Sequence, residues 1–218
     1  MAVAAYALTT LAQAKTELGI PGATTTHDAV IERLIDTVSS AAAEFCERTL
    51  HYQAGIAERV PGYGGQLLYV SRTPIVSITS IELLPSSMSN AGTGTTYAAT
   101  SYIIRNANAG IIFRLDGWQW TANYAERLTS APLRPGTEDT RFLVTYAGGY
   151  VTRPQGGSVN LPPEIEQAVL WGVANLWRHR GREIHGQVET EDMAAIDWKS
   201  NALPAASKTL LMPYKRVR

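Results

Sequence analysis

Apolar residues recur at helical spacing along residues 25–46. They stand three or four positions apart, which places them on one broad stripe of a helix. Thr25 and Asp28 have the spacing of a capping box and predict that the helix begins near Thr25. The stripe consists of Val30, Ile31, Leu34, Ile35, Val38, Ala42, Phe45 and Cys46. The pattern therefore predicts a long helix with one buried face.

A shorter helix is predicted before it. Thr10 followed by Gln13 is another capping-box pattern, and Gly19 is a residue type that commonly ends helices. The turn IPGATTT then separates this helix from the longer one.

A third helix is predicted from residues 161–181, LPPEIEQAVLWGVANLWRHRG. Pro163 suits the first turn, and Glu164 and Glu166 suit the positive end of the helix dipole. The buried stripe would be Ile165, Ala168, Val169, Gly172, Val173 and Leu176. The last turn holds the cations Arg178, His179 and Arg180. The helix dipole alone accounts for the acidic residues in the first turn and the basic residues in the last turn.

Between these helices the hydrophobic period changes from 3.6 to 2, which predicts strands. A glycine turn separates two strands, residues 56–60 and 66–70, and a third strand covers 74–83. In this third strand Val76 and Ile78 alternate on one face, whereas Ile81 and Leu83 fall on the other. A bulge near Ser80 would bring both pairs to the same face. A hairpin and one more strand follow. Their segments are YIIR and IIFRL around NANAG, and RFLVTYAGGY.

The order of elements predicts an α+β fold: a small helical bundle with a β-rich insertion and an extended C-terminal tail. The bundle would comprise residues 1–54 and 160–182, the insertion 55–159, and the C-terminal arm 183–218. Residues 85–101 are small, polar and nearly uncharged, which is typical of a flexible or contact-making loop.

Composition favours self-association over a free monomer. Lys+Arg and Asp+Glu are both 19 in the 218 residues, so no net charge repels identical copies or draws the chain to nucleic acid. One cysteine, Cys46, predicts a reducing compartment. No signal-peptide pattern and no apolar run near the ~18 residues of a membrane span are present, so no membrane partner is expected.

No arrangement of residues predicts catalysis. The glycines of PGYGGQ lie between strands, Cys46 lies on a buried stripe, and His179 and His185 lack metal-ligand spacing. The paired carboxylates of ETED, residues 189–192, lack the buried setting that separates two pKa values. We therefore expect no enzyme, no cofactor and no metal site.

Two basic clusters remain. Arg178, Arg180 and Arg182 would suit weak phosphate contact along a channel rather than sequence-specific DNA reading. The terminal SKTLLMPYKRVR mixes cations with large apolar residues, whose exposure is unfavourable by ~1.5 to 3 kcal/mol each. This segment either folds back on its own core as a last strand or inserts into a partner's groove.

The ordered set of segments resembles the head-tail connector (adaptor) proteins of tailed bacteriophages. The resemblance is carried by LTTLAQAKTELGI, DAVIERLIDTVSSAAAEFCERTL, LLYVSRTPIVSITSIELL, FLVTYAGGY, PPEIEQAVLWGVANLWRHRG and LLMPYKR. Loop 85–101, the segment around Trp118 and Trp120, and the acidic stretch 183–197 depart from the simplest family pattern.

The resemblance implies a non-enzymatic virion protein, assembled in the host cytoplasm and located in the neck between capsid and tail. It would form a dodecameric ring that binds the portal, continues the channel for packaged DNA and contacts tail or neck proteins. The positions that match the family's portal-binding terminal motif are Leu210, Leu211, Tyr214, Lys215 and Arg216. The alternative is a tail-completion or other neck protein that binds the tail tube instead of the portal.

Overall fold

The computed structural model describes residues 3–84, 94–119, 121, 142–184 and 202–216, with only the backbone for 180–184. The chain divides into two compact units. The helical unit comprises Met1–Tyr52 and Tyr150–Arg218, and the β unit comprises Gln53–Gly149. The predicted α+β class is confirmed. Residues 150–159, assigned to the β-rich insertion from sequence, cluster with the helical unit.

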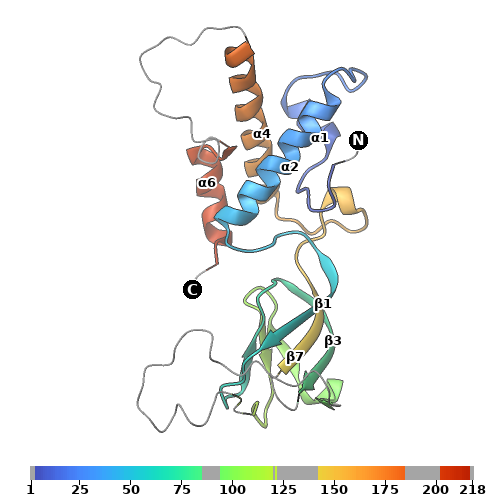
Figure 1. Cartoon of the computed structure of the whole chain (residues 1–218), viewed down its shortest axis with the longest axis vertical. Coiled ribbons are helices and arrows are strands. Elements are labelled where there is room, and N and C mark those ends of the chain that lie inside the picture. The colour runs from blue at the N-terminus through green and yellow to red at the C-terminus, as the bar shows by residue number, and fades with distance from the viewer. Residues whose placement is uncertain (1–2, 85–93, 120, 122–141, 185–201, 217–218) are drawn as a thin grey trace. The chain divides into compact units, whose positions relative to one another are not determined.

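In the described part of the helical unit, α2 and α4 lie side by side at the centre, and α1 and α6 pack against them (Figure 1). The helices are α1 (Leu11–Glu17), α2 (Asp28–Phe45), α4 (Pro163–Ile184) and α6 (Ala205–Leu211). Two 3-10 turns, η2 (Arg153–Gln155) and η3 (Met212–Tyr214), complete the unit. The backbone of α4 continues through Gly181, where the sequence suggested a stop.

The two long helices bury the stripes that the sequence predicts, and their shared core is aliphatic. Gly172 of α4 marks the closest approach, because a Cβ there would lie 2.5 Å from the Ala202 carbonyl oxygen and 2.6 Å from Cγ1 of Val38. The fully buried residues include Ile31, Ile35, Val38 and Ala42 of α2 and Ile165, Ala168, Val169 and Val173 of α4. Leu34 packs at the margin of this core and is half-buried.

The start of α2 differs from the predicted capping box. The helix begins at Asp28, after His27, which makes no side-chain cap. Asp28 instead pairs with the buried Lys15, whose Nζ lies 2.6 Å from Oδ1 and also donates to the carbonyls of Gly22 and Thr24. The carboxylate thus stabilises the turn between α1 and α2. The other predicted capping box, at Thr10 and Gln13 of α1, is confirmed.

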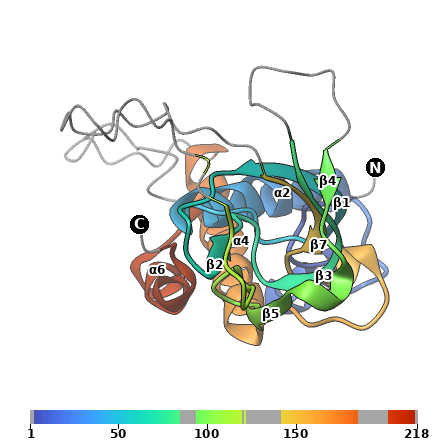
Figure 2. The same ribbon diagram turned by 90° about the horizontal axis from the view of Figure 1, so that it is seen from below.

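Two antiparallel sheets form the β unit, in the orders β1-β7-β3-β4 and β2-β6-β5 (Figures 1 and 2). The strands are β1 (Gln53–Val60), β2 (Leu67–Tyr69), β3 (Ile75–Leu83), β4 (Thr95–Thr96), β5 (Ile103–Asn106), β6 (Ile111–Phe113) and β7 (Phe142–Gly148). The predicted hairpin is β5–β6. The bulge predicted near Ser80 is confirmed, because the β3–β7 register shifts between Ile78 and Ser80.

Parts of two predicted loops belong to the folded β unit. Thr95–Thr96 form β4, and Ala99–Ser101 form a 3-10 turn, η1, within the segment predicted as a loop over 85–101. Trp118 was expected to be part of an added aromatic segment, yet only 2% of its surface is exposed. It packs edge-on to Phe142 with the ring centroids 5.5 Å apart. Trp120 lies outside the described residues.

Candidate interaction surfaces

The terminal segment, residues 202–216, folds back on the helical unit. It was predicted as part of an extended arm, but it forms α6 and η3. Leu211 is fully buried in the core, and the Ser207 hydroxyl donates to the Ala168 carbonyl of α4 at 2.9 Å. Large apolar side chains are stabilised by removal from water, and α2 and α4 supply that environment within the same chain. Of the two possibilities left open by the sequence, the fold shows the first, as a helix rather than a strand.

Polar contacts hold the end of this segment against the C-terminal end of α2. The Arg216 N–H donates to the carbonyl of Cys46 at 3.0 Å. The Lys215 ammonium lies 3.4 Å from a Glu47 carboxylate oxygen and 5.5 Å from the centroid of the Phe45 ring. Cys46 is the C-cap residue of α2, and its carbonyl group has no hydrogen-bond partner within the helix. The terminal segment supplies that partner.

The five residues that resemble the portal-binding motif therefore differ in accessibility. Leu211 is inside the core, and Leu210 and Tyr214 pack against it while partly exposed. The Tyr214 hydroxyl donates to Glu164 at 3.1 Å. Lys215 and Arg216 are exposed. The portal-binding role of these residues stays a prediction, and in this fold Lys215 and Arg216 are the two exposed residues of the five, with Lys215 also paired with Glu47.

The basic end of α4 is described only in part. Arg178 is exposed and borders a hollow of about 310 Å³. The side chains of Arg180 and Arg182 lie outside the described residues. Trp171 lies in the same hollow and is 37% exposed. The other residues that line it are Glu17, Ala174, Asn175, Pro204 and Ala206.

A second surface, which sequence reasoning missed, lies on the outer side of α2. The N-terminal segment crosses this side: the Ala4 N–H donates to Asp36, and the Leu8 N–H donates to the Ser39 hydroxyl. Tyr6 between them remains 43% exposed. Nothing in the sequence pattern indicated this crossing, because hydrogen bonds between residues 31 or 32 positions apart depend on the tertiary fold.

Two adjoining hollows flank Tyr6, with volumes of about 180 and 510 Å³. Both are lined by Tyr6 and by Ser40 of α2. We call them together the α2 groove. The smaller hollow also contacts Leu8, Ser39, Ala43, Thr49, Leu50 and His51, and the larger contacts Arg33, Asp36, Thr37, Ala41, Glu44 and Ala202. Both hollows expose more apolar than polar surface, and the charged residues of the groove line the larger one.

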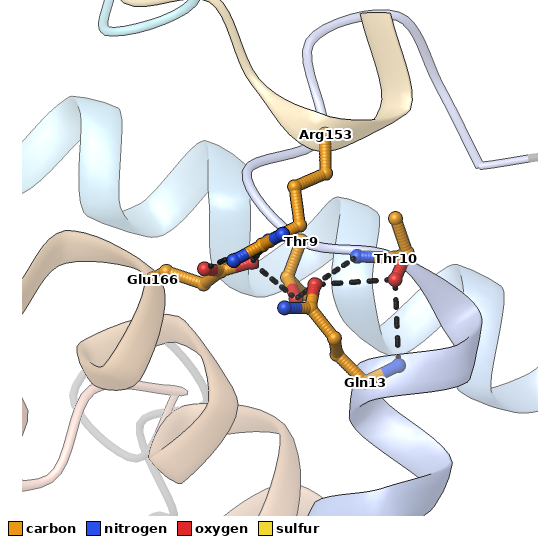
Figure 3. Close-up of polar contacts among 5 residues, drawn as sticks. All are labelled: Thr9, Thr10, Gln13, Arg153 and Glu166. Atoms are coloured by element: carbon orange, nitrogen blue, oxygen red, sulfur yellow. Dashed lines mark hydrogen bonds and ion pairs between the residues drawn. The ribbon is translucent and has the colours of Figure 1, made fainter. Parts of the chain in front are cut away.

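A polar network joins η2, α4 and the start of α1 (Figure 3). The Arg153 Nε donates to the Glu166 carboxylate oxygens at 3.1 and 3.2 Å. The Thr9 hydroxyl lies 3.4 Å from Glu166 and 3.1 Å from the side-chain oxygen of Gln13, which also belongs to the α1 capping box. Glu166 is only 9% exposed, so its charge requires this compensation. The sequence indicated the position of Glu166 on the helix but not its partner.

Burial raises the pKa values of two groups in the helical unit, the Cys46 thiol and the Tyr214 hydroxyl. Burial raises the pKa of the Cys46 thiol to about 11, against opposing effects of Arg48 and Lys215. Burial, followed by the hydrogen bond to Glu164, raises the pKa of Tyr214. A thiol with a raised pKa is protonated near neutrality and is a poor nucleophile. The buried Cys46 is therefore not an activated nucleophile in this fold.

Neither a metal-binding cluster nor a membrane-spanning helix is present in the described part of the chain. No group of three or more His, Cys, Asp or Glu side chains lies there in a position to hold a metal ion. None of the helices within those ranges is long and apolar enough to span a bilayer.

Three solved structures share the fold across the whole chain. The neck of an empty gene transfer agent particle, computed with C6 symmetry, contains a chain that is 16% identical with a TM-score of 0.58. The virion of a native gene transfer agent particle gives 18% and 0.56, and the native neck computed with C12 symmetry gives 17% and 0.55. The alignments cover 100% of this chain and 94, 94 and 93% of those chains. At this identity the likeness establishes the fold.

No curated protein sequence matches the chain. A family model does match, over residues 8–80. That range contains α1, α2, β1, β2 and the first part of β3, including the capping box and helical stripe from which the resemblance was inferred. The family is that of the phage gp6-like head-tail connector proteins, and the resemblance of this chain to the head-tail connector family is thereby confirmed.

Proposed function

We propose that this protein is a non-enzymatic structural component of the neck of a phage or phage-like particle. The observation that carries the proposal is the agreement of two comparisons. Residues 8–80 match a head-tail connector family, and the whole chain shares its fold with chains from the neck and virion of gene transfer agent particles. Because a shared fold alone does not imply a shared function, the proposal relies on the fold and the family match together, which point to the same part of the particle.

Within the neck, the protein would form a closed ring that joins the portal to the tail and surrounds the DNA channel. Necks computed with C6 and C12 symmetry are consistent with a cyclic arrangement of such chains, with twelve copies under C12. Closed cyclic association uses two different faces of each copy. The zero net charge of the chain places no electrostatic barrier against packing identical copies together.

The portal would contact the exposed side of the terminal segment. Lys215 and Arg216 are available there, whereas Leu211 stabilises the chain's own core. Removing residues 207–218 would delete the buried Ser207 and Leu211 and would confuse loss of binding with loss of folding. Substituting the two exposed cations keeps the core intact, but Lys215→Glu breaks contacts with Glu47 and Phe45 that help to hold the segment, so the stability of each variant is measured beside its portal attachment.

The neck assignment is tested by imaging particles that contain the full chain carrying an affinity label. We expect label density in a ring between capsid and tail, and particles without the protein should lack tails or leak DNA. Label density in the capsid shell or along the tail shaft would refute the proposal.

The portal assignment is tested with purified full-length protein and the portal of the same particle. The double substitution Lys215→Glu and Arg216→Glu should reduce portal attachment at least tenfold, and Lys208→Glu on α6 is the matched control. If the double variant attaches normally to the portal but no longer binds tail tubes, the protein belongs to the tail-completion class instead.

A further inference from the structure

The chain passes between the helical unit and the β unit at two places. The unit boundaries lie between Tyr52 and Gln53 and between Gly149 and Tyr150. Each unit has a hydrophobic core of its own, and the two cores have no residue in common among the described ones. Two units that each bury their own core and are joined by short connections are expected to move relative to one another, unless a large apolar interface holds them.

On the helical side of the boundaries, the two connecting strands are hydrogen-bonded to each other. The Tyr52 N–H donates to the Tyr150 carbonyl at 2.7 Å, and the Tyr150 N–H donates to the Leu50 carbonyl at 2.8 Å. The side-chain amide of Gln155, in η2, donates to the Tyr52 carbonyl at 2.7 Å. Hydrogen bonds of this length hold both strands in one conformation as far as the boundary. The helical unit therefore anchors its own ends of both connections.

On the β side, the same two strands are again paired. Gln53 of β1 lies opposite Gly148 of β7, and the Gly149 N–H donates to the Pro74 carbonyl at 2.9 Å. The β unit thus anchors its own ends of the connections in the same way. Bending between the units is therefore confined to the few residues at the two boundaries.

Gly149 lies where the pairing of the two strands changes. On the β side the pairing is antiparallel, between Gln53 and Gly148, and on the helical side it is parallel, between His51 and Tyr150. Gly149 makes this change with a φ of 99°, in the region that favours glycine. A residue without a side chain passes between backbone conformations with fewer steric barriers than any other residue. Gly149 is therefore suited to absorb a change of direction.

The other connection is also weakly restrained where it enters the β unit. The β1–β7 register shifts between Gln53 and Ile56, so a bulge separates Gln53 from the rest of the ladder. Ala54 and Gly55 in this bulge are exposed. A bulge interrupts the ladder hydrogen bonds and bends its strand. Both connections thus enter the β unit through residues that are held less firmly than the strands beyond them.

We infer that the two connections form a hinge, which lets the β unit take more than one orientation on the helical unit. Hinges are a few element-terminal residues that absorb a change in φ and ψ, and Gly149 is the main one here. For its role in the particle, the inference rests on the proposed ring. Necks that contain chains of this fold are computed with C12 and with C6 symmetry. Under sixfold symmetry, twelve identical chains fall into two sets with different surroundings, and a hinge lets each set fit its own.

The hinge is tested with pairs of spin labels on cysteines introduced into the full-length chain. Thr209→Cys with Asn108→Cys places one label on each unit. Thr26→Cys with Thr209→Cys places both labels on the helical unit, and Thr96→Cys with Asn108→Cys places both on the β unit. All four positions are exposed, whereas the native Cys46 is buried and should not be labelled. Double electron–electron resonance then measures the distribution of distances for each pair.

The distribution between the units should be at least twice as broad as either distribution within a unit, or should have two maxima. Gly149→Ala should narrow it by at least a third, because alanine disfavours a φ of 99° and leaves the hinge fewer conformations. Gly156→Ala is the matched control. Gly156 also has a positive φ, of 74°, and lies within the helical unit with no atom within 4 Å of an added Cβ. It should leave the distribution between the units unchanged.

A distribution between the units as narrow as the other two would overturn the inference, and so would equal effects of the two glycine substitutions. If Gly149→Ala does not fold, the three distributions measured with the native glycine still decide. The measurement uses the purified protein, so its failure and failure of the neck assignment are separable. Particle imaging decides independently whether the protein is located in the neck.

Discussion

The cores of the two units are built from different side chains. Among the described residues, the nineteen that form the helical core include no aromatic residue, and the aromatic neighbours Phe45, Tyr150, Trp177 and Tyr214 are only partly buried. The β core of twelve residues includes Tyr102, Trp118, Phe142 and Tyr146. The helical unit thus keeps its aromatic side chains at its margin, where partners can contact them, whereas the β unit uses them for its own stability.

This difference is consistent with self-association through the helical unit. Aliphatic residues fill the closely packed space between helices, as the contact of Gly172 with Val38 illustrates. Aromatic rings with polar tips suit margins and interfaces. Three substitutions, in decreasing order of expected effect, and then a change of pH test how far the two units differ.

Phe142→Ala should cause the largest loss of stability. Phe142 is fully buried between Trp118 and the sheets, so truncation removes apolar contacts and leaves a cavity. We expect a loss of about 3 to 5 kcal/mol in the free energy of unfolding of the β unit. Urea denaturation followed by hydrogen exchange would assign the loss to that unit, and Val76→Ala, at a site 48% exposed, is the control. Equal effects of both variants would contradict an aromatic core.

Leu211→Ala should destabilise the helical unit and release its terminal segment. The side chain is fully buried against α2 and α4, and its truncation should cost about 2 to 5 kcal/mol. Limited proteolysis should then cleave near α6, while Met212→Ala should change stability by less than about 0.5 kcal/mol. A protease-resistant Leu211→Ala chain would mean that the segment is not held by this contact.

Arg153→Gln should have a smaller effect in the same unit. It leaves the mostly buried Glu166 with the Thr9 hydroxyl as its remaining partner (Figure 3). Because half of the Arg153 side chain is exposed, the expected cost is only about 1 kcal/mol. Chemical denaturation measures it, and the double variant with Glu166→Gln should recover part of the loss. No recovery would show that the two charges are not coupled.

Alkaline pH should produce a difference that grows with pH. Burial raises the pKa of Cys46 from 9.0 to about 11, and burial with the hydrogen bond to Glu58 raises that of Tyr146 from 10.0. Both groups are neutral in the fold, so their stabilisation is complete below the ordinary pKa and is lost as pH rises toward the raised value. Stability of the helical unit should therefore fall from pH 9, and that of the β unit from pH 10.

Cys46→Ala and Tyr146→Phe are the matched variants for this last comparison. The first should flatten the decline of the helical unit, and the second should flatten that of the β unit. Denaturation at several pH values, with hydrogen exchange to resolve the units, would measure both. A decline that neither substitution alters would have to arise from other groups.

Local patterns were sufficient for much of the fold. The helical stripe of α2, the capping box of α1 and the bulge of β3 depend on residues within a few positions of one another. The same ordered segments supported the resemblance to head-tail connectors, and the match over residues 8–80 confirmed it. The expected boundaries failed where distant groups intervened, as at Asp28, which pairs with Lys15 instead of capping α2.

The sequence by itself determined which elements form and which family the chain resembles, because helix and strand periodicity and capping are short-range properties. Tertiary structure alone decided that Leu211 is core and that Trp118 is buried. These outcomes depend on which apolar surfaces meet across long sequence separations. Hydrophobic burial is non-directional, so a segment such as LLMPY can satisfy it within its own chain or on a partner, and only the packed helices show where it does so.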